Sequence, residues 1–177
     1  MISSLLYSSQ EGFLKSHLFY LLAFIIIFSS VQKHVFKEAL DLNGDNATYY
    51  MGATAIHQGD GYADLTIPGK PKTNTFPPGY PFLMSLVMNV SDTFVAQKVF
   101  NSVLLGISCL LLYFIMFIFS RNKLISLTVS LLPSFNYLIL SFSTMMMSEP
   151  SFIAFSMLSF LALFKLRENN DFISIFK

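Results

Sequence analysis

Four runs of apolar residues constrain this chain most, because each is close to the length needed to cross a lipid bilayer. They cover approximately residues 17–31, 99–120, 124–142 and 150–166. A hydrocarbon core about 30 Å thick needs roughly 20 residues in a helix, and backbone polar groups in lipid must be satisfied within the chain. The sequence therefore predicts an all-α membrane protein with about four transmembrane helices in a single transmembrane domain, residues 1–177.

Composition supports a membrane protein and excludes one class of partner. Hydrophobic residues make up 54% of the chain and charged residues only 12%, whereas a soluble domain carries about 25% charged residues. The net charge of +1 argues against a nucleic-acid-binding surface. The single cysteine, Cys109, cannot form an intrachain disulfide.

The first apolar run is short enough to be a signal peptide. However, Lys33, His34 and Lys37 follow it, and no small-x-small cleavage pattern is present. We interpret it as an uncleaved membrane anchor.

Basic residues near the ends of the runs predict the orientation. Arg121 and Lys123 separate the second and third runs, and Lys165 and Arg167 follow the fourth. Lys and Arg in short loops favour the cytoplasm, whereas charges in long loops count less. We therefore expect a cytoplasmic N-terminus and an extracytoplasmic first loop at 32–98, although that loop contains four lysines: Lys33, Lys37, Lys70 and Lys72.

Within this loop, two short helices are expected next to the membrane. Residues 45–58 show helical spacing, with Asn43 or Asp45 available to cap the N-terminus and Gly59-Asp60-Gly61 to end the helix. The face expected from that spacing contains Ala47, Tyr50, Met51, Thr54, Ala55 and Gln58. Pro77-Pro78 then starts a second, apolar helix that extends to about Met88.

Asp45 is the first candidate for chemistry. It follows the first span at the outer boundary, where a carboxylate can accept a proton or bind a divalent cation against a lipid phosphate. The structural alternative is that Asp45 caps the helix and interacts with its dipole.

Glu149 is the second candidate, because ionisable groups at membrane depth are costly and mark functional sites. Ser148-Glu149-Pro150 also has the pattern of an ordinary helix start, so both interpretations stay open. Tyr49 and Tyr50 could stack on a sugar or anchor the interface. Lys70 and Lys72 could contact a phosphate or simply be solvated.

The order of these motifs resembles the N-terminal part of GT-C fold glycosyltransferases, in the group of protein O-mannosyltransferases and lipid A aminoarabinose transferases. The resemblance depends on segment 44–49 (GDNATY) with Asp45 and Tyr49 in a D-x-x-x-Y pattern, on 59–62 (GDGY), on 75–81 (TFPPGYP), and on Ser148-Glu149 opening a later span. It extends over approximately residues 15–167.

The resemblance implies a transferase that moves a sugar from a polyprenyl-phosphate donor to a glycan, lipid or protein acceptor, with inversion, at the outer face of a bacterial inner membrane. It implies that Asp45 and Glu149 are catalytic, that Asp45 is a candidate metal ligand, and that a divalent cation is a candidate cofactor. Substrate contacts would come from five residues: Tyr49, Tyr50, Lys70, Lys72 and Tyr80.

Two features depart from the family. Some members have Lys directly before Pro-Pro, where this chain has Phe76. Members also have more spans, whereas this sequence ends in a polar tail at 167–177, so we expect the N-terminal part of a larger or split enzyme, with the missing C-terminal part as a partner. The alternative function is a non-catalytic membrane scaffold or a subunit that binds a lipid-linked sugar. A small transporter ranks last, because the spans contain few polar residues.

Overall fold

A computed structural model describes residues 2–39 and 44–168, with side chains from Lys15 onward. The candidate cap Asn43 and the tail at 169–177 lie outside the described residues. Every regular element in the described part is helical. The elements are α1 (Ile2–Val35), α2 (Asp45–His57), α3 (Gly79–Met88), α4 (Phe94–Ser120), α5 (Lys123–Leu131), the 3₁₀ helix η1 (Leu132–Phe135), α6 (Tyr137–Ser143) and α7 (Glu149–Glu168).

Three segments in the described part of the chain are long and apolar enough to cross a membrane. They are Lys15–Val35 within α1, Phe94–Ser120, and Glu149–Leu166. The protein is therefore an all-α, multi-pass membrane protein. At 34 residues, α1 is about 50 Å long, so its first turns extend beyond a hydrocarbon core about 30 Å thick.

The apolar run at 124–142 forms a broken helix. The segments Lys123–Phe135 and Tyr137–Ser143 are bent by 74° relative to each other. Pro133 lies in the intervening 3₁₀ turn, and Asn136 adopts extended backbone and accepts a hydrogen bond from the Ile139 N–H at 3.2 Å. Asn136 therefore ends one helical segment and caps the next. The pair adds a fourth span only if both segments count as one.

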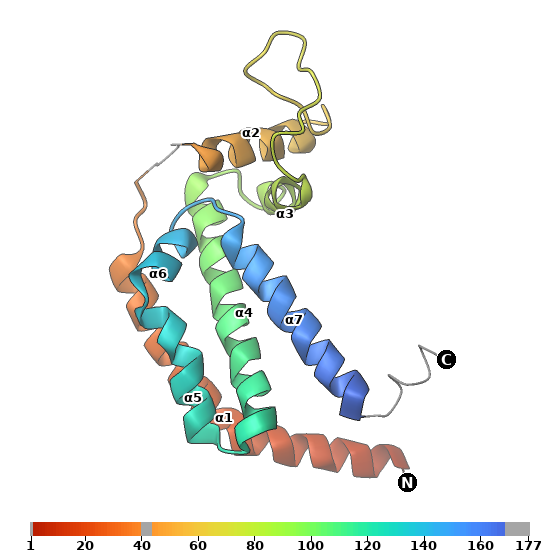
Figure 1. Cartoon of the computed structure of the whole chain (residues 1–177), viewed down its shortest axis with the longest axis vertical. Helices are drawn as coiled ribbons and strands as arrows, with labels where there is room; N and C mark the ends of the chain where they lie inside the picture. The colour runs from red at the N-terminus through yellow and green to blue at the C-terminus, as the bar shows by residue number, and fades with distance from the viewer. Residues whose placement is uncertain (1, 40–43, 169–177) are drawn as a thin grey trace.

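The membrane helices pack around α4, with α5 on one side and α7 on the other (Figure 1). Their shared core, here called the bundle core, contains Phe24, Phe28, Leu105, Cys109, Tyr113, Leu127, Leu131 and Leu140. Gly106 lets α1 and α4 approach closely, since a Cβ atom there would lie 3.0 Å from Phe28 Cε1. A pair of polar side chains also joins α1 to α6: Gln32 Nε2 donates to Ser143 Oγ at 3.1 Å.

Helices α2 and α3, with the residues between them, form a unit at one end of the bundle that we call the head (residues 44–88). In Figure 1, α2 crosses the end of α4 and the 58–78 loop extends away from the bundle. A Cβ atom on Gly52 would lie 2.6 Å from Tyr62 Cε2, so glycine is needed where this loop folds back on α2. Gly59 and Gly61 have positive φ and end α2 as expected.

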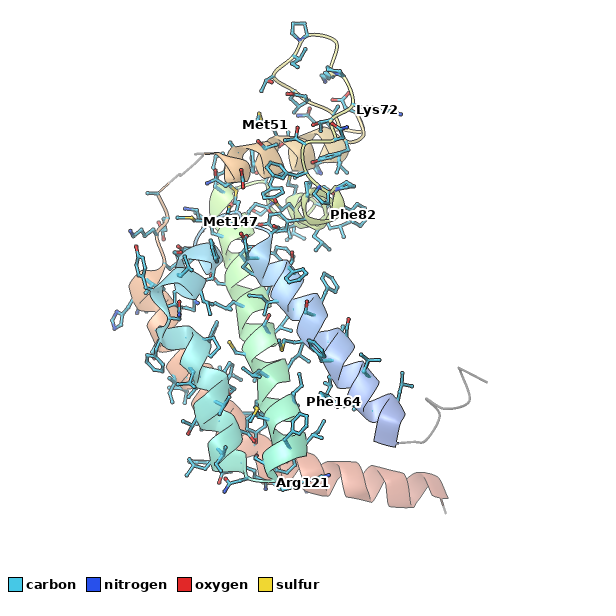
Figure 2. All side chains as sticks on the ribbon, viewed as in Figure 1. Met51, Lys72, Phe82, Arg121, Met147 and Phe164 are labelled. Carbon is cyan, nitrogen blue, oxygen red and sulfur yellow. The ribbon has the colours of Figure 1, made fainter. Side chains whose placement is uncertain are left out.

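The buried face of α2 overlaps only in part with the expected one, since Ala55 is fully buried but Tyr50, Met51 and Gln58 are not. The buried side chains of α2 include Asn46, Tyr49 and Ala53, which lie at i, i+3 and i+7. Met51 instead points away from the bundle (Figure 2). Helical spacing alone defines several stripes on a short helix. The stripe containing Tyr49 is buried because α3 and the start of α7 pack against it.

Candidate functional site

The candidate site lies where the head meets the ends of α4 and α7. A second buried cluster occupies this junction, here called the head cluster: Tyr49, Ala53, Tyr80, Met84, Met88 and Met146. The Tyr49 ring meets the Tyr80 ring edge to face, with centroids 5.1 Å apart and planes at 90°, and lies 4.9 Å from the Phe76 ring. Aromatic pairs prefer such offset and edge-to-face arrangements. The D-x-x-x-Y motif and the Pro-Pro element therefore meet at their aromatic residues.

Asn101 of α4 connects three parts of this junction. Its Oδ1 accepts a 2.9 Å hydrogen bond from the Tyr80 hydroxyl, and its Nδ2 donates to the carbonyl oxygens of Met145 and Met147 at 2.6 and 2.9 Å. Asn101 is fully buried. One side chain thus joins α3 to the loop that leads into α7. Met147 lies in that loop, beside the end of α4 (Figure 2).

The Tyr49 hydroxyl meets Ser148, which directly precedes α7. The two side-chain oxygens are 3.2 Å apart, so either can be the donor. The Ser148 carbonyl accepts from the Phe152 N–H at 3.0 Å and from the Ser151 hydroxyl at 2.7 Å. Ser148 therefore begins α7 through its backbone, while its side chain holds α2.

A cavity of about 450 Å³ opens beside this contact. Its lining combines hydroxyl and aromatic groups near the head with apolar side chains along α7: Tyr49, Pro77, Gly79, Tyr80, Leu83, Ser148, Ser151, Phe152 and Phe155. Phe152 and Phe155 are 73% and 55% exposed, on a helix that can span a membrane. The cavity thus has a polar end at the head and an apolar end facing lipid.

Glu149 is the first residue of α7. Its Oε2 atom is buried and accepts no hydrogen bond from the residues that the structure describes. Burial raises the pKa of the Tyr80 hydroxyl far above its ordinary value; the hydrogen bond to Asn101 opposes this shift, and the nearby Glu149 carboxylate and Tyr49 add to it. Glu149 therefore places negative charge close to the tyrosine pair. A buried carboxylate oxygen without a partner is costly, which suggests that it acts on a ligand.

Asp45 is exposed and is the first residue of α2. The residue before it, Gly44, is the N-cap, with positive φ and no side-chain cap hydrogen bond. Asp45 therefore does not cap the helix through its own side chain. A carboxylate in the first turn still complements the helix dipole.

Tyr50 lies apart from the Tyr49 cluster. Its hydroxyl donates to the Asp92 carbonyl at 3.2 Å, and its ring lies 4.4 Å from that of Phe94. Burial, followed by the nearby Asp92 charge, raises the pKa of Tyr50, and the Thr54 hydrogen bond opposes this. These contacts join α2 to the start of α4.

The two candidate lysines lie in the 58–78 loop, beyond α2. Lys70 forms an ion pair with Asp60 at 2.5 Å, and Lys72 pairs with Ala63 in an isolated antiparallel bridge. Figure 2 shows Lys72 on the far side of α2 from α7. The structure therefore brings Tyr49, Tyr80, Ser148 and Glu149 together, and it places Tyr50, Lys70 and Lys72 around other contacts.

Sequence reasoning missed three buried polar residues in the first turns of α4: Gln97, Lys98 and Asn101. The Lys98 ammonium group donates to the carbonyls of Lys37 and Ala39, after α1. The available signal was their spacing, because three polar residues at i, i+1 and i+4 share a face at the start of an otherwise apolar helix. These residues connect the membrane helices to the head.

The described residues include no group of three or more His, Cys, Asp or Glu side chains that could hold a metal ion. Comparison with known proteins does not assign a family: no family model, no curated protein and no solved structure matches the chain.

Proposed function

We propose that this protein is a GT-C-type glycosyltransferase that uses a polyprenyl-phosphate-linked sugar. We further propose that it lies in a bacterial inner membrane, with the N-terminus in the cytoplasm, the broken helix at 123–143 as a fourth span, and the head outside. In this orientation the cavity beside Tyr49 lies at the outer rim of the bilayer.

The cavity itself is the observation that carries the proposal. A lipid-linked sugar has a long apolar tail, a charged phosphate and a polar ring. The lining matches the tail and the sugar, with exposed Phe152 and Phe155 along α7 and the hydroxyls of Tyr49 and Ser148 at the head. A volume of about 450 Å³ is within the usual range for small-molecule sites. The aromatic rings of Tyr49 and Tyr80 offer faces and edges to a sugar.

In the proposed reaction, an acceptor hydroxyl oxygen attacks the anomeric carbon of the sugar. The bond between that carbon and the phosphate oxygen breaks, the electron pair leaves with the phosphate, and the anomeric configuration inverts. Asp45 takes the acceptor proton as general base. Because a phosphate is already a good leaving group, positioning and charge neutralisation supply most of the rate enhancement.

A divalent cation at this rim would be held by the carboxylates of Glu149 and Asp45. The Glu149 Oε2 atom is buried, has no hydrogen-bond partner among the described residues, and is the kind of oxygen that Mg²⁺ prefers. As the alternative to its role as general base, Asp45 would supply the second carboxylate ligand. Mg²⁺ usually keeps several waters and binds through one or two carboxylates together with substrate phosphates. Two acidic residues therefore suffice if the donor phosphate completes the shell, and the cation would neutralise charge on the leaving group.

A second candidate function is a non-catalytic subunit that binds a lipid-linked sugar. The specific observation in its favour is that the cavity lining contains hydroxyl, aromatic and apolar groups but no carboxylate or ammonium group. Binding needs only those groups. Transfer also needs Asp45, which lies outside this lining.

The test is sugar transfer in membranes that contain the protein, with a radiolabelled polyprenyl-phosphate sugar as donor. Loss of a general base typically costs about 10²- to 10⁴-fold in rate, so we expect Asp45→Asn to abolish measurable transfer. The matched control is Asp92→Asn, which removes another exposed carboxylate of the head end and leaves transfer unchanged. Full activity of Asp45→Asn would contradict the catalytic assignment. Donor binding without transfer by the wild-type chain would favour the binding subunit.

A further inference from the structure

A second groove lies between α4 and α7 at the end of the bundle opposite the head. Its volume is about 480 Å³, and it is lined by Leu111, Phe114, Phe117, Ile118, Arg121, Leu161 and Lys165. Figure 2 shows Arg121 and Phe164 at this far end. The Phe119 and Phe164 rings meet edge to face at 5.0 Å, so the two helices remain in contact here. The groove is remote from the Tyr49 cavity and has no part in the proposed transfer.

On each of the two helices that line the groove, apolar side chains are followed by a basic side chain. On α4, an apolar stripe begins at Leu111 and ends at Arg121; on α7, Leu161 is followed one turn later by Lys165. Arg121 and Lys165 are both exposed, whereas the apolar lining residues are partly buried. Two cationic groups therefore stand at the mouth of a furrow with apolar walls.

The length of the furrow matches one leaflet of a bilayer. From Leu111 to Arg121 the helix rises about 15 Å, at 1.5 Å per residue. Half of a hydrocarbon core about 30 Å thick is also about 15 Å. An acyl chain lying along the stripe would therefore end near the bilayer centre, with its headgroup level with Arg121 and Lys165.

From this geometry we infer that the groove binds an anionic phospholipid. One acyl chain lies between α4 and α7 against Phe114 and Leu161, and the headgroup phosphate pairs with the Arg121 guanidinium and the Lys165 ammonium. Charge complementarity selects the occupant, because the two charged residues that line the groove, Arg121 and Lys165, are both cationic.

The simpler explanation for both cations is the helix dipole. Arg121 is the C-cap of α4, and Lys165 lies in the last turn of α7. Cations at helix C-termini are stabilising whatever lipid is present. The two explanations differ in one respect. Only a binding site makes the stabilisation by Arg121 and Lys165 depend on the charge of the lipid and on the free volume of the groove.

The test is native mass spectrometry of the purified protein, with phosphatidylglycerol and phosphatidylcholine in competition. We expect the wild-type chain to retain phosphatidylglycerol preferentially. The double variant Arg121→Gln/Lys165→Gln should lose about 30-fold of that preference, since each of the two basic residues near an anionic headgroup contributes about 1 kcal/mol. The control Lys70→Gln/Lys72→Gln makes the same change in net charge at the head and should retain the preference.

A second variant tests the groove itself. Leu161→Trp keeps both cations but fills the space between the helices, so it should reduce phosphatidylglycerol retention to a similar extent. Circular dichroism and the melting temperature in detergent verify that each variant is folded. Unchanged lipid preference in the Arg121/Lys165 variant, or an equal loss in the Lys70/Lys72 control, would overturn the inference. A melting temperature lowered equally with and without phosphatidylglycerol, at unchanged retention, would assign both cations to the helix dipoles.

Discussion

The head cluster and the bundle core are built differently, although each buries rings between helices. In the bundle core, residues such as Phe24, Phe28 and Leu105 fill space by apolar contact, and the Tyr113 hydroxyl has a polar partner, His17 Nδ1 at 2.6 Å. In the head cluster, the hydroxyls of Tyr49 and Tyr80 each find a polar partner, Ser148 and Asn101. Apolar packing tolerates rearrangement, whereas a buried hydrogen-bond network requires a defined geometry. The two clusters therefore differ in degree: two tyrosine hydroxyls have polar partners in the head cluster, beside the cavity, and one does in the bundle core.

The sharpest test of this contrast removes the residue on which the head junction depends. In Asn101→Leu, three groups lose their partner: the buried Tyr80 hydroxyl and the partly buried carbonyls of Met145 and Met147. Each orphaned buried group costs about 1–3 kcal/mol, so we expect a loss of about 4 kcal/mol in the free energy of unfolding. The measurement is an SDS titration of the purified protein followed by circular dichroism.

Ser102→Ala is the matched control for that variant. Ser102 is the next residue of α4 and donates one hydrogen bond, to the Ser143 carbonyl at 3.0 Å. Interhelical hydrogen bonds in membrane proteins contribute about 0.6 kcal/mol on average, so this change should be small. If Asn101→Leu lowers the free energy of unfolding no more than Ser102→Ala does, the head cluster does not depend on its hydrogen bonds more than the bundle core does.

Substitution of one glycine in the head and one in the bundle core is expected to give stability changes of intermediate size. A Cβ atom on Gly52 would lie 2.6 Å from the Tyr62 ring, whose hydroxyl is tied to the Phe76 carbonyl, while one on Gly106 would lie 3.0 Å from Phe28. Overpacking costs about 1–3 kcal/mol, and Ala gains about 1 kcal/mol over Gly in a helix. We expect Gly52→Ala to lower stability by about 1–2 kcal/mol and Gly106→Ala to be close to neutral.

Melting temperatures of the two glycine variants in one detergent make this comparison directly. Gly79→Ala is the control, because a Cβ atom there meets nothing within 4 Å. The reverse order, with Gly106→Ala the more damaging, would mean that the bundle core is the less adaptable region.

The smallest expected effect is at the polar contact between α1 and α6. Gln32→Leu removes both polar groups of Gln32, while the Ser143 hydroxyl keeps its 2.7 Å hydrogen bond to the Leu140 carbonyl. No hydroxyl is left unpaired, so we expect a change within about 1 kcal/mol. A loss as large as that of Asn101→Leu, in the same SDS titration, would show that the bundle also depends on a polar network.

Helix bounds were largely predictable from sequence. The helix expected at 45–58 is observed as Asp45–His57, and the one expected from Pro77-Pro78 to about Met88 is observed as Gly79–Met88. Proline in the first turn and glycine after the last are local signals that need no tertiary information. The apolar runs at 17–31, 99–120 and 150–166 likewise match three helices that can cross a membrane.

The sequence did not predict which face of a short helix is buried or which residues a buried side chain contacts. The buried stripe of α2 contains Tyr49 because α3 packs there, and periodicity cannot show which neighbour a short helix meets. Asn101 has the same limitation, since its three partners lie 21 to 46 residues away along the chain. Asp45 and Glu149 remain candidates from motif order, and only Glu149 gains support from an unpartnered buried oxygen.

The most direct test of the central claim uses a property of the sequence: the chain contains no tryptophan. Phe155→Trp places a single tryptophan in the lining of the Tyr49 cavity, and Phe160→Trp places one further along α7 as a control. We predict that a polyprenyl-phosphate sugar added to the protein in nanodiscs shifts the emission of Phe155→Trp saturably and leaves that of Phe160→Trp unchanged. Equal responses at both positions, or none at Phe155→Trp, would contradict binding of a lipid-linked sugar in this cavity.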